Sequence, residues 1–283
     1  MKTKPIPAPR STLASFNAPL AAEALARLIR DEVTKVGFQR VVLGLSGGVD
    51  SAVVACLAAR ALGPKNTLCV LMPYRTSDPS SVRDAETIVR LLHAESVEVD
   101  IAPIVDAYLE ANPTADRNRR GNVMARVRMM VLYDLSAATG ALVLGTSNKT
   151  ELLVGYGTLF GDMASAMAPI GDLYKTEVRL LAKHLGLTQS IIDKVPNADL
   201  WPGQSDEGEL GLTYDELDQL LAELVDKRIP PDWLTERGYD PNRVERVVEM
   251  IRSTQFKRRP PLIAKLSTRS INHDFLYKRD WGK

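Results

Sequence analysis

One short turn in the sequence carries glycine, hydroxyl and carboxylate groups at a spacing suited to binding a phosphate group. Its residues are Ser46-Gly47-Gly48-Val49-Asp50-Ser51, and they lie between apolar runs at 41–45 and 51–62. A strand that leads through such a turn into a helix points backbone N–H groups and the helix N-terminus at one place, which favours an anion. Asp50 would repel that anion, and a bound Mg²⁺ ion would remove the conflict.

Three known kinds of turn could also account for this segment. A Walker A loop requires Lys-Ser or Lys-Thr after its last glycine, which this turn lacks. The segment Gly44-Leu45-Ser46-Gly47-Gly48 matches the G-x-S-x-G elbow, so Ser46 could be the nucleophile of an α/β serine hydrolase. That reaction also needs a histidine, and the sequence offers His93, His184 and His273. The third alternative is a purely structural turn.

Predicted strands and helices alternate around this turn. Apolar runs predict the strands, whereas apolar positions at helical spacing predict the connecting helices. Strands are expected at 41–45, 67–72, 97–101 and 141–145, and helices between Pro19 and Gly37, at 51–62, at 78–92 and before Gly140. This order is typical of an α/β fold with a doubly wound, Rossmann-like parallel sheet, whose ligands bind beyond the carboxyl ends of the strands.

The second half of the chain is expected to add C-terminal helices and two irregular segments. Residues 147–172 are rich in glycine, and a loop of this length is usually functional, so it is interpreted as a cover over the active site. A helix is predicted at 175–186, and a second irregular segment at 197–211. The capping box Thr213-Tyr214-Asp215-Glu216 opens another helix, and Asp240-Pro241 opens the last.

Composition argues against several classes of partner. The 36 basic and 35 acidic side chains leave a formal net charge of +1, so no global field favours nucleic acid or a membrane surface. The two cysteines, Cys56 and Cys69, match neither a disulfide framework nor a zinc site, which suits a cytoplasmic setting. The polar, proline-broken start lacks a signal-peptide pattern. We interpret residues 1–18 as a flexible arm and 19–283 as a single domain.

Several segments resemble one enzyme family. The turn S-G-G-x-D-S is similar to that of the PP-loop ATP pyrophosphatases, which cleave ATP between its α- and β-phosphates. Within that superfamily, ammonia-dependent NAD synthetases carry segments similar to five others in this sequence. These are Gly145-Thr146-Ser147-Asn148-Lys149-Thr150-Glu151, Ala125-Arg126-Val127-Arg128-Met129, the stretch 169–176, the stretch 196–207 and Lys257-Arg258-Arg259-Pro260-Pro261. The resemblance covers the chain from about Pro19 to its end.

The resemblance implies a role for each matching residue. Asp50 and Lys175 would be catalytic, Asp50 and Glu151 would hold Mg²⁺, and Arg126 and Lys257 would contact deamido-NAD. Residues two apart on a helix point in nearly opposite directions, so Arg128 is instead expected at an interface or in a salt bridge. The implied ATP contacts are Gly44, Leu45, Ser46, Gly47, Gly48, Val49, Asp50, Ser51, Thr146, Lys175 and Asn197.

The activity implied by the resemblance is the final step of NAD biosynthesis. ATP would adenylate the carboxylate of deamido-NAD, and ammonia would displace AMP to give NAD. Family members are homodimers with substrate near the interface, so a homodimer is expected. The chain departs from the family at Asn197, Phe256 and Leu159, where some members have serine or threonine, histidine and lysine. The alternative functions are those of another PP-loop ligase, a tRNA-modifying enzyme or a nucleotide-binding regulator.

Overall fold

Four strands form one parallel sheet among the residues that the computed structural model describes, which are 16–201, 203–271 and 274. The strand order is β3-β2-β1-β4, and β1 pairs with both β2 and β4. Their bounds are β1 (Arg40–Gly44), β2 (Thr67–Leu71), β3 (Glu95–Glu98) and β4 (Ala141–Val143). The predicted α/β class with a parallel sheet is confirmed.

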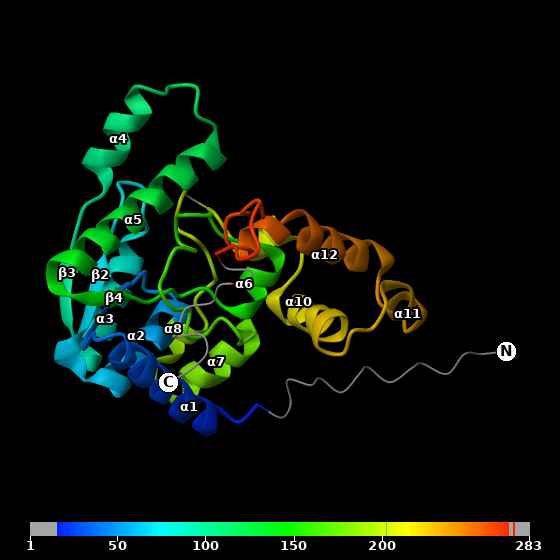
Figure 1. The fold of residues 1–283 in the computed structure, drawn as a ribbon, viewed down its shortest axis with the longest axis horizontal. Coiled ribbons are helices and arrows are strands. Elements are labelled where there is room, and N and C mark those ends of the chain that lie inside the picture. The colour runs from blue at the N-terminus through cyan, green and yellow to red at the C-terminus, as the bar shows by residue number, and fades with distance from the viewer. Residues whose placement is uncertain (1–15, 202, 272–273, 275–283) are drawn as a thin grey trace.

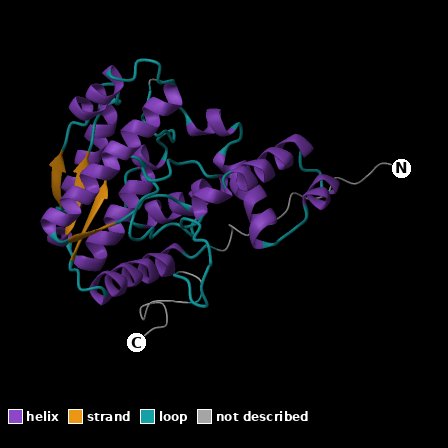
Figure 2. Ribbon diagram, turned by 45° about the horizontal axis from the view of Figure 1, so that its top comes forward, coloured by secondary structure: helices purple, strands orange, loops and turns teal. Residues whose placement is uncertain are grey.

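Helices cover both faces of this sheet (Figures 1 and 2). On one face α1 (Ala18–Lys35), α2 (Val49–Leu62) and α7 (Lys175–His184) pack against one another around the largest hydrophobic cluster. On the other face α5 (Arg117–Thr139) packs against β1 and β4. Helix α2 buries ten of its fourteen residues, since it lies between the sheet and two other helices. This burial explains why its sequence is apolar almost all round.

The order of the strands creates a reversal point beside β1. The chain runs from β1 outward to β2 and β3, then returns through α5 to place β4 on the opposite side of β1. Ligands of doubly wound sheets bind in the crevice at such a reversal, outside the carboxyl ends of the strands. The segments that follow β1 and β4 are the predicted phosphate turn and the segment of Thr146 and Glu151. The fold therefore brings two distant predicted motifs together.

A second group of helices packs beside the sheet domain around its own hydrophobic cluster. Tyr214, Leu217 and Leu221 of α10 (Tyr214–Leu221) are among its fully buried members. Helices α10, α11 and α12 extend to one side of the sheet, with α6 between them and the sheet (Figure 1). The remaining helical elements are η2 (Pro64–Asn66), α3 (Pro79–Leu92), α4 (Ala102–Glu110), α6 (Lys149–Val154), α8 (Gln189–Ile192), α9 (Asp206–Leu210), η3 (Ala222–Asp226), α11 (Pro231–Glu236), α12 (Pro241–Ser253) and η4 (Gln255–Arg258).

Most predicted helix starts are confirmed. Asp78 and Asp240 accept hydrogen bonds at the N-termini of α3 and α12, each before a proline. Thr213 and Glu216 form the predicted capping box of α10. Proline at the first helical position and a polar N-cap are local signals, so they can be recognised without knowledge of tertiary contacts.

Four expectations need correction. The predicted strand 97–101 lies two to three residues earlier, because Ile101 is already the N-cap of α4, and Asp100 accepts a bond from Ala102 N at 2.8 Å. The two segments predicted as irregular each contain a short helix, α6 and α9. Phe16 packs against the main core and Ala18 begins α1, so the arm is shorter than predicted. The rest of the arm, residues 1–15, lies outside the described residues.

None of the helices in the described residues combines the length and the apolar character that a membrane crossing requires.

Candidate active site

A cavity of about 610 Å³ opens at the carboxyl ends of β1 and β4. It brings together most of the residues predicted to act in the site. Gly47 and Arg126 are the predicted residues that do not line it. The predicted residues that do line it are Gly44, Leu45, Ser46, Gly48, Val49, Asp50, Ser51, Thr146, Glu151, Lys175, Asn197 and Lys257.

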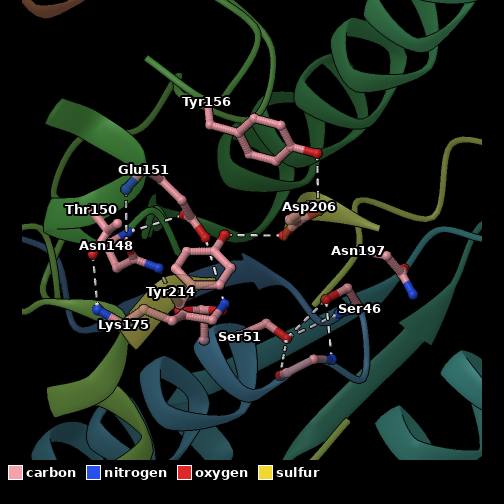
Figure 3. A network of polar contacts seen from close by, with 12 residues as sticks. Ser46, Ser51, Asn148, Thr150, Glu151, Tyr156, Lys175, Asn197, Asp206 and Tyr214 are labelled. Carbon is pink, nitrogen blue, oxygen red and sulfur yellow. Dashed lines mark hydrogen bonds and ion pairs between the residues drawn. The ribbon is translucent and has the colours of Figure 1, made fainter. Parts of the chain in front are cut away.

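The turn after β1 is held by its own hydroxyl groups. Ser51 Oγ donates to the carbonyl of Gly48 at 3.0 Å and accepts the N–H of Ser46 at 3.2 Å (Figure 3). No side chain caps the N-terminus of α2, which begins after Gly48, so its first N–H groups are available to an anion. Gly47 has φ +77°, and a Cβ at this position would lie 2.3 Å from the carbonyl oxygen of Ser81. Glycine is therefore required here both by conformation and by space.

A buried lysine lies between the turn and α6. Lys175 is the first residue of α7 and only 2% of it is exposed. Its ammonium group forms an ion pair with Asp50 of α2, and it lies 3.6 Å from Glu151 Oε1 of α6. The ring of Tyr214 lies 5.0 Å from the same nitrogen. Three helix N-termini thus direct one cation and two carboxylates to a single point.

The charges in this cluster perturb one another. Burial alone would lower the pKa of Lys175, but Asp50 and Glu151 together raise it, so the side chain stays protonated. Burial is also the main reason that the pKa of Glu151 is raised, with the charge of Asp50 adding to it and that of Lys175 opposing it. Glu151 therefore holds a proton more readily than an exposed carboxyl group does, and Lys175 offsets only part of that effect.

Asn148 joins this cluster and was missed by the sequence analysis. Its side chain donates to Asp50 Oδ1 at 2.9 Å and accepts the N–H of Glu151 at 3.0 Å, as the N-cap of α6. The N-x-x-E pattern that these residues form is a capping-box signal, so it could have been found. Because Asn148 and not Thr146 caps the helix, capping does not explain Thr146.

Tyr156 and Asp206 line the cavity, and the fully buried Tyr214, which does not line it, contacts Asp206. Tyr156 and Tyr214 both donate their hydroxyl groups to Asp206, at 2.9 and 3.1 Å (Figure 3). The Tyr156 hydroxyl oxygen also lies 2.8 Å from Glu209 Oε2, so the two carboxylates share its one proton. Burial raises the pKa of Asp206, whereas Lys175 and the two hydroxyl groups lower it. The sequence carries no local signal for this contact, since the residues come from separate segments.

Arg126 and Arg128, two of the arginines of α5, lie in different surroundings. Arg128 lines the cavity and donates to the carbonyl of Met72 at 3.1 Å, and no ion pair of Arg128 is found among the described residues. Arg126 is exposed and donates to the carbonyl of Leu159 at 3.3 Å. The position of Arg128 depends on how α5 packs beside the segment that follows β2, which helical spacing alone does not define. The contact of Arg126 with deamido-NAD stays a prediction.

Two further predicted residues, Lys257 and Asn197, also line the cavity. Lys257 donates to the carbonyl groups of Gly155 and Gly157 at 2.7 and 2.8 Å, and thereby holds the glycine-rich segment after α6. Burial lowers the pKa of Lys257. Asn197 lines the cavity with its amide 3.5 Å from the carbonyl of Val195. The glycine-rich segment predicted as a cover contributes a wall of the cavity.

The described residues place no histidine at Ser46 to serve as the base of a serine hydrolase. Ser46 Oγ lies 3.2 Å from Ser51 Oγ and 3.3 Å from the N–H of Gly48. Within the described part of the chain, no histidine lines the cavity. His93 ends α3 and His184 ends α7, while His273 lies outside the described residues. Ser46 lines the cavity, and its binding of phosphate stays a prediction.

A family model described as NAD synthase matches residues 21–261 of this chain. The chain belongs to this family. The NH3-dependent NAD+ synthetase of Chlorobaculum parvum is 54% identical over 262 residues, which cover 93% of this chain and 95% of the relative. The family resemblance inferred from the turn and the segments around Thr146, Arg126 and Lys175 is confirmed.

Solved structures of NAD synthase relatives share the fold. The NH3-dependent NAD synthetase of Campylobacter jejuni matches with a TM-score of 0.76 and 35% identity, covering 89% of this chain and all of that one. The NMN synthetase of Francisella tularensis matches with a TM-score of 0.79 and 31% identity over the same shares. The family model spans every residue that lines the cavity, from Gly44 to Lys257.

Proposed function

We propose that this chain is a ligase that amidates deamido-NAD with ammonia at the expense of ATP, giving NAD, AMP and pyrophosphate in the final step of NAD biosynthesis. The observation that supports it best is the buried Lys175 at the cavity, paired with Asp50 of the phosphate turn and near Glu151. A nucleotide-binding regulator would need the turn but would not need a buried cation between two carboxylates. Membership of the NAD synthase family supports the same conclusion.

The chemical problem is a poor leaving group. A carboxylate does not release oxide, so ammonia can displace oxygen only after the carboxylate has been converted to a better acyl donor. In the proposed reaction a carboxylate oxygen attacks the α-phosphate of ATP, and pyrophosphate departs into the turn of Ser46, Gly48 and Ser51. Ammonia then attacks the acyl carbon, and AMP leaves with that carboxylate oxygen. No protein nucleophile is required.

The chain's own groups would act mainly by charge and position. Lys175 is held in place before ATP arrives, so its charge can offset the negative charge that grows on pyrophosphate without reorganisation. The N-terminus of α2 adds the positive end of a helix dipole at the same point. Thr146 and Asn197 both line the cavity and are proposed to contact the nucleotide.

The donor set fits a Mg²⁺ ion. No group of three or more His, Cys, Asp or Glu side chains in the described residues is arranged to hold a metal. Mg²⁺ in nucleotide enzymes, however, usually binds one or two carboxylates together with phosphate oxygens and water. Asp50 and Glu151 supply such a pair at the edge of the phosphate turn, and we propose that they hold the ion. Bound there, Mg²⁺ would neutralise phosphate charge.

Free ammonia is the proposed nitrogen source. Glutamine-dependent amidation needs a nucleophilic thiol or threonine in a separate amidase site. Cys56 and Cys69 are buried in α2 and β2, and burial raises the pKa of both thiols to about 12. Neutral buried thiols are unreactive, so neither cysteine suits that role.

A homodimer and a cytoplasmic location belong to the same proposal. Helix α5 exposes Met130 and Tyr133, with 47% and 42% of their surfaces accessible, close to the exposed Arg126. A partner chain against α5 would bring a covering surface to Arg126, where we propose that deamido-NAD binds. Two buried, unpaired cysteines suit a reducing compartment.

The test is a product balance. The purified chain is incubated with ATP, Mg²⁺, ammonium and deamido-NAD, and NAD, AMP and pyrophosphate are quantified, with nicotinic acid mononucleotide as the comparison substrate. Equal amounts of the three products, formed faster from the dinucleotide, are expected. Formation of ADP and phosphate, preference for the mononucleotide, or nucleotide binding without turnover would each overturn the proposal.

A further inference from the structure

A buried carboxylate outside the cavity joins the two helices that carry Lys175 and Glu151. Asp218 lies on α10, has no exposed surface and is not among the residues that line the cavity. Charged side chains are rarely buried to this degree unless hydrogen bonds satisfy them. The hydrogen-bond partners of Asp218 therefore explain how this carboxylate can be buried.

Both oxygens of Asp218 accept bonds from the first turns of α6 and α7. Oδ1 accepts the hydroxyl group of Thr150, the second residue of α6. Oδ2 accepts the backbone N–H and the hydroxyl group of Thr176, the second residue of α7, both at 2.8 Å. A negative charge at two helix N-termini is favourable because both dipoles point their positive ends at it.

The same contacts reach Lys175 directly. The hydroxyl oxygen of Thr150 accepts the backbone N–H of Lys175 at 3.0 Å while its proton is donated to Asp218 (Figure 3 shows the bond to Lys175). Glu151 follows Thr150 in the chain, so one carboxylate fixes the starts of both helices. Tyr214, four residues before Asp218 on the same face of α10, places its ring beside the Lys175 ammonium group.

We propose that Asp218 is a positioning residue, which sets the separation of Lys175 and Glu151 by tying the N-termini of α6 and α7 to α10. This inference rests on the proposed function, because it concerns the turnover to which those two side chains contribute. The phosphate turn belongs to β1 and α2 and is held by its own serines. Loss of Asp218 is therefore expected to affect turnover more than ATP binding.

The test compares two buried acids of the same helical group. Asp218→Asn keeps the shape but removes an acceptor that Thr176 uses. Glu223→Gln is the matched control, since Glu223 is also buried, pairs with Lys227 and Arg237 and does not line the cavity. Asp218→Asn is expected to lower kcat by roughly 10- to 100-fold, with little change in the KM for ATP. Glu223→Gln is expected to keep the wild-type kcat at a lower melting temperature.

A second pair decides the question if Asp218→Asn does not fold. Thr150→Val removes the bridging hydroxyl group and is expected to lower kcat, whereas Thr150→Ser keeps the hydroxyl group and is expected to restore most of the activity. Equal kcat values for the valine and serine variants would overturn the inference. A loss in Asp218→Asn no larger than in Glu223→Gln, or confined to the KM for ATP, would do the same.

Lys175→Ala, measured in parallel, distinguishes failure of the proposed function from failure of the positioning role of Asp218. If Lys175→Ala keeps its turnover, the assignment of the active site fails, and the role of Asp218 fails with it. If Lys175→Ala is inactive while Asp218→Asn behaves as its control does, the proposed function stands and the positioning role alone is wrong.

Discussion

At Lys175, burial and charge act in opposite directions. A lone buried ammonium group would lose its proton, yet Asp50 and Glu151 raise the pKa of Lys175 above its ordinary value. The side chain is thus a fixed cation in a site where water cannot screen it. A fixed charge of this kind stabilises a transition state more than the ground state when negative charge grows nearby.

Removal of this cation has a defined expectation. Lys175→Ala should lower kcat by about 10²-fold or more, since one preorganised electrostatic partner is lost. Lys149→Ala is a matched control, because Lys149 also pairs with a carboxylate, Asp226, and lies 4.6 Å from a tyrosine ring, but it does not line the cavity. Steady-state kinetics should show near-normal turnover for the control; near-normal turnover for Lys175→Ala would refute its role.

The cysteines allow a chemical test of the ammonia hypothesis. Burial raises the pKa of Cys56 and Cys69 to about 12, so at pH 8 only about one thiol in 10⁴ is ionised. A thiol reagent should therefore label neither residue in the native protein, and activity should survive the treatment. Both should react once denaturant unfolds the chain. Rapid native labelling together with loss of activity would point to a reactive thiol instead.

At the scale of the elements, the conformation of the turn after β1 requires the backbone of Gly47 to lie close to α3. Gly47→Ala would place a methyl group against the carbonyl of Ser81 at a φ that costs a non-glycine residue roughly 1–2 kcal/mol. Gly186 has a similar φ of +79° but open space around it. Both variants should melt earlier, whereas only Gly47→Ala should bind ATP at least about tenfold more weakly, as calorimetry can measure. Equal ATP affinity would show that the turn does not bind phosphate.

Sequence patterns predicted the elements that local signals define. The strand and glycine turn at Ser46 were evident, as were the caps at Asp78 and Thr213, because each depends on neighbouring residues only. Helix α6 was missed since its glycine-rich surroundings obscured a short helix capped by Asn148. Asp218 lies in a polar stretch that resembles a solvated helix, and only the packing of α10 on α6 and α7 buries it.

In the whole molecule, the cavity lies between two independently packed groups. The sheet and its helices form the largest hydrophobic cluster, and α6, α10 and α12 form another. Asp50 comes from the first group and Tyr214 from the second, while Lys175 is at the start of α7, which packs on both α2 and α10. The individual motifs of the site could be predicted from the sequence. The walls of the cavity could not, because they depend on how the two hydrophobic clusters and their helices pack together.

The path of one oxygen atom tests the central claim most directly. Deamido-NAD labelled with ¹⁸O in both carboxylate oxygens is converted with ATP, Mg²⁺ and ammonia, and the AMP is analysed by mass spectrometry. If the carboxylate attacks the α-phosphate, each AMP carries one ¹⁸O atom and the amide of NAD retains the other. Unlabelled AMP, or label found in phosphate or pyrophosphate, would contradict adenylation and with it the assigned role of the turn and Lys175.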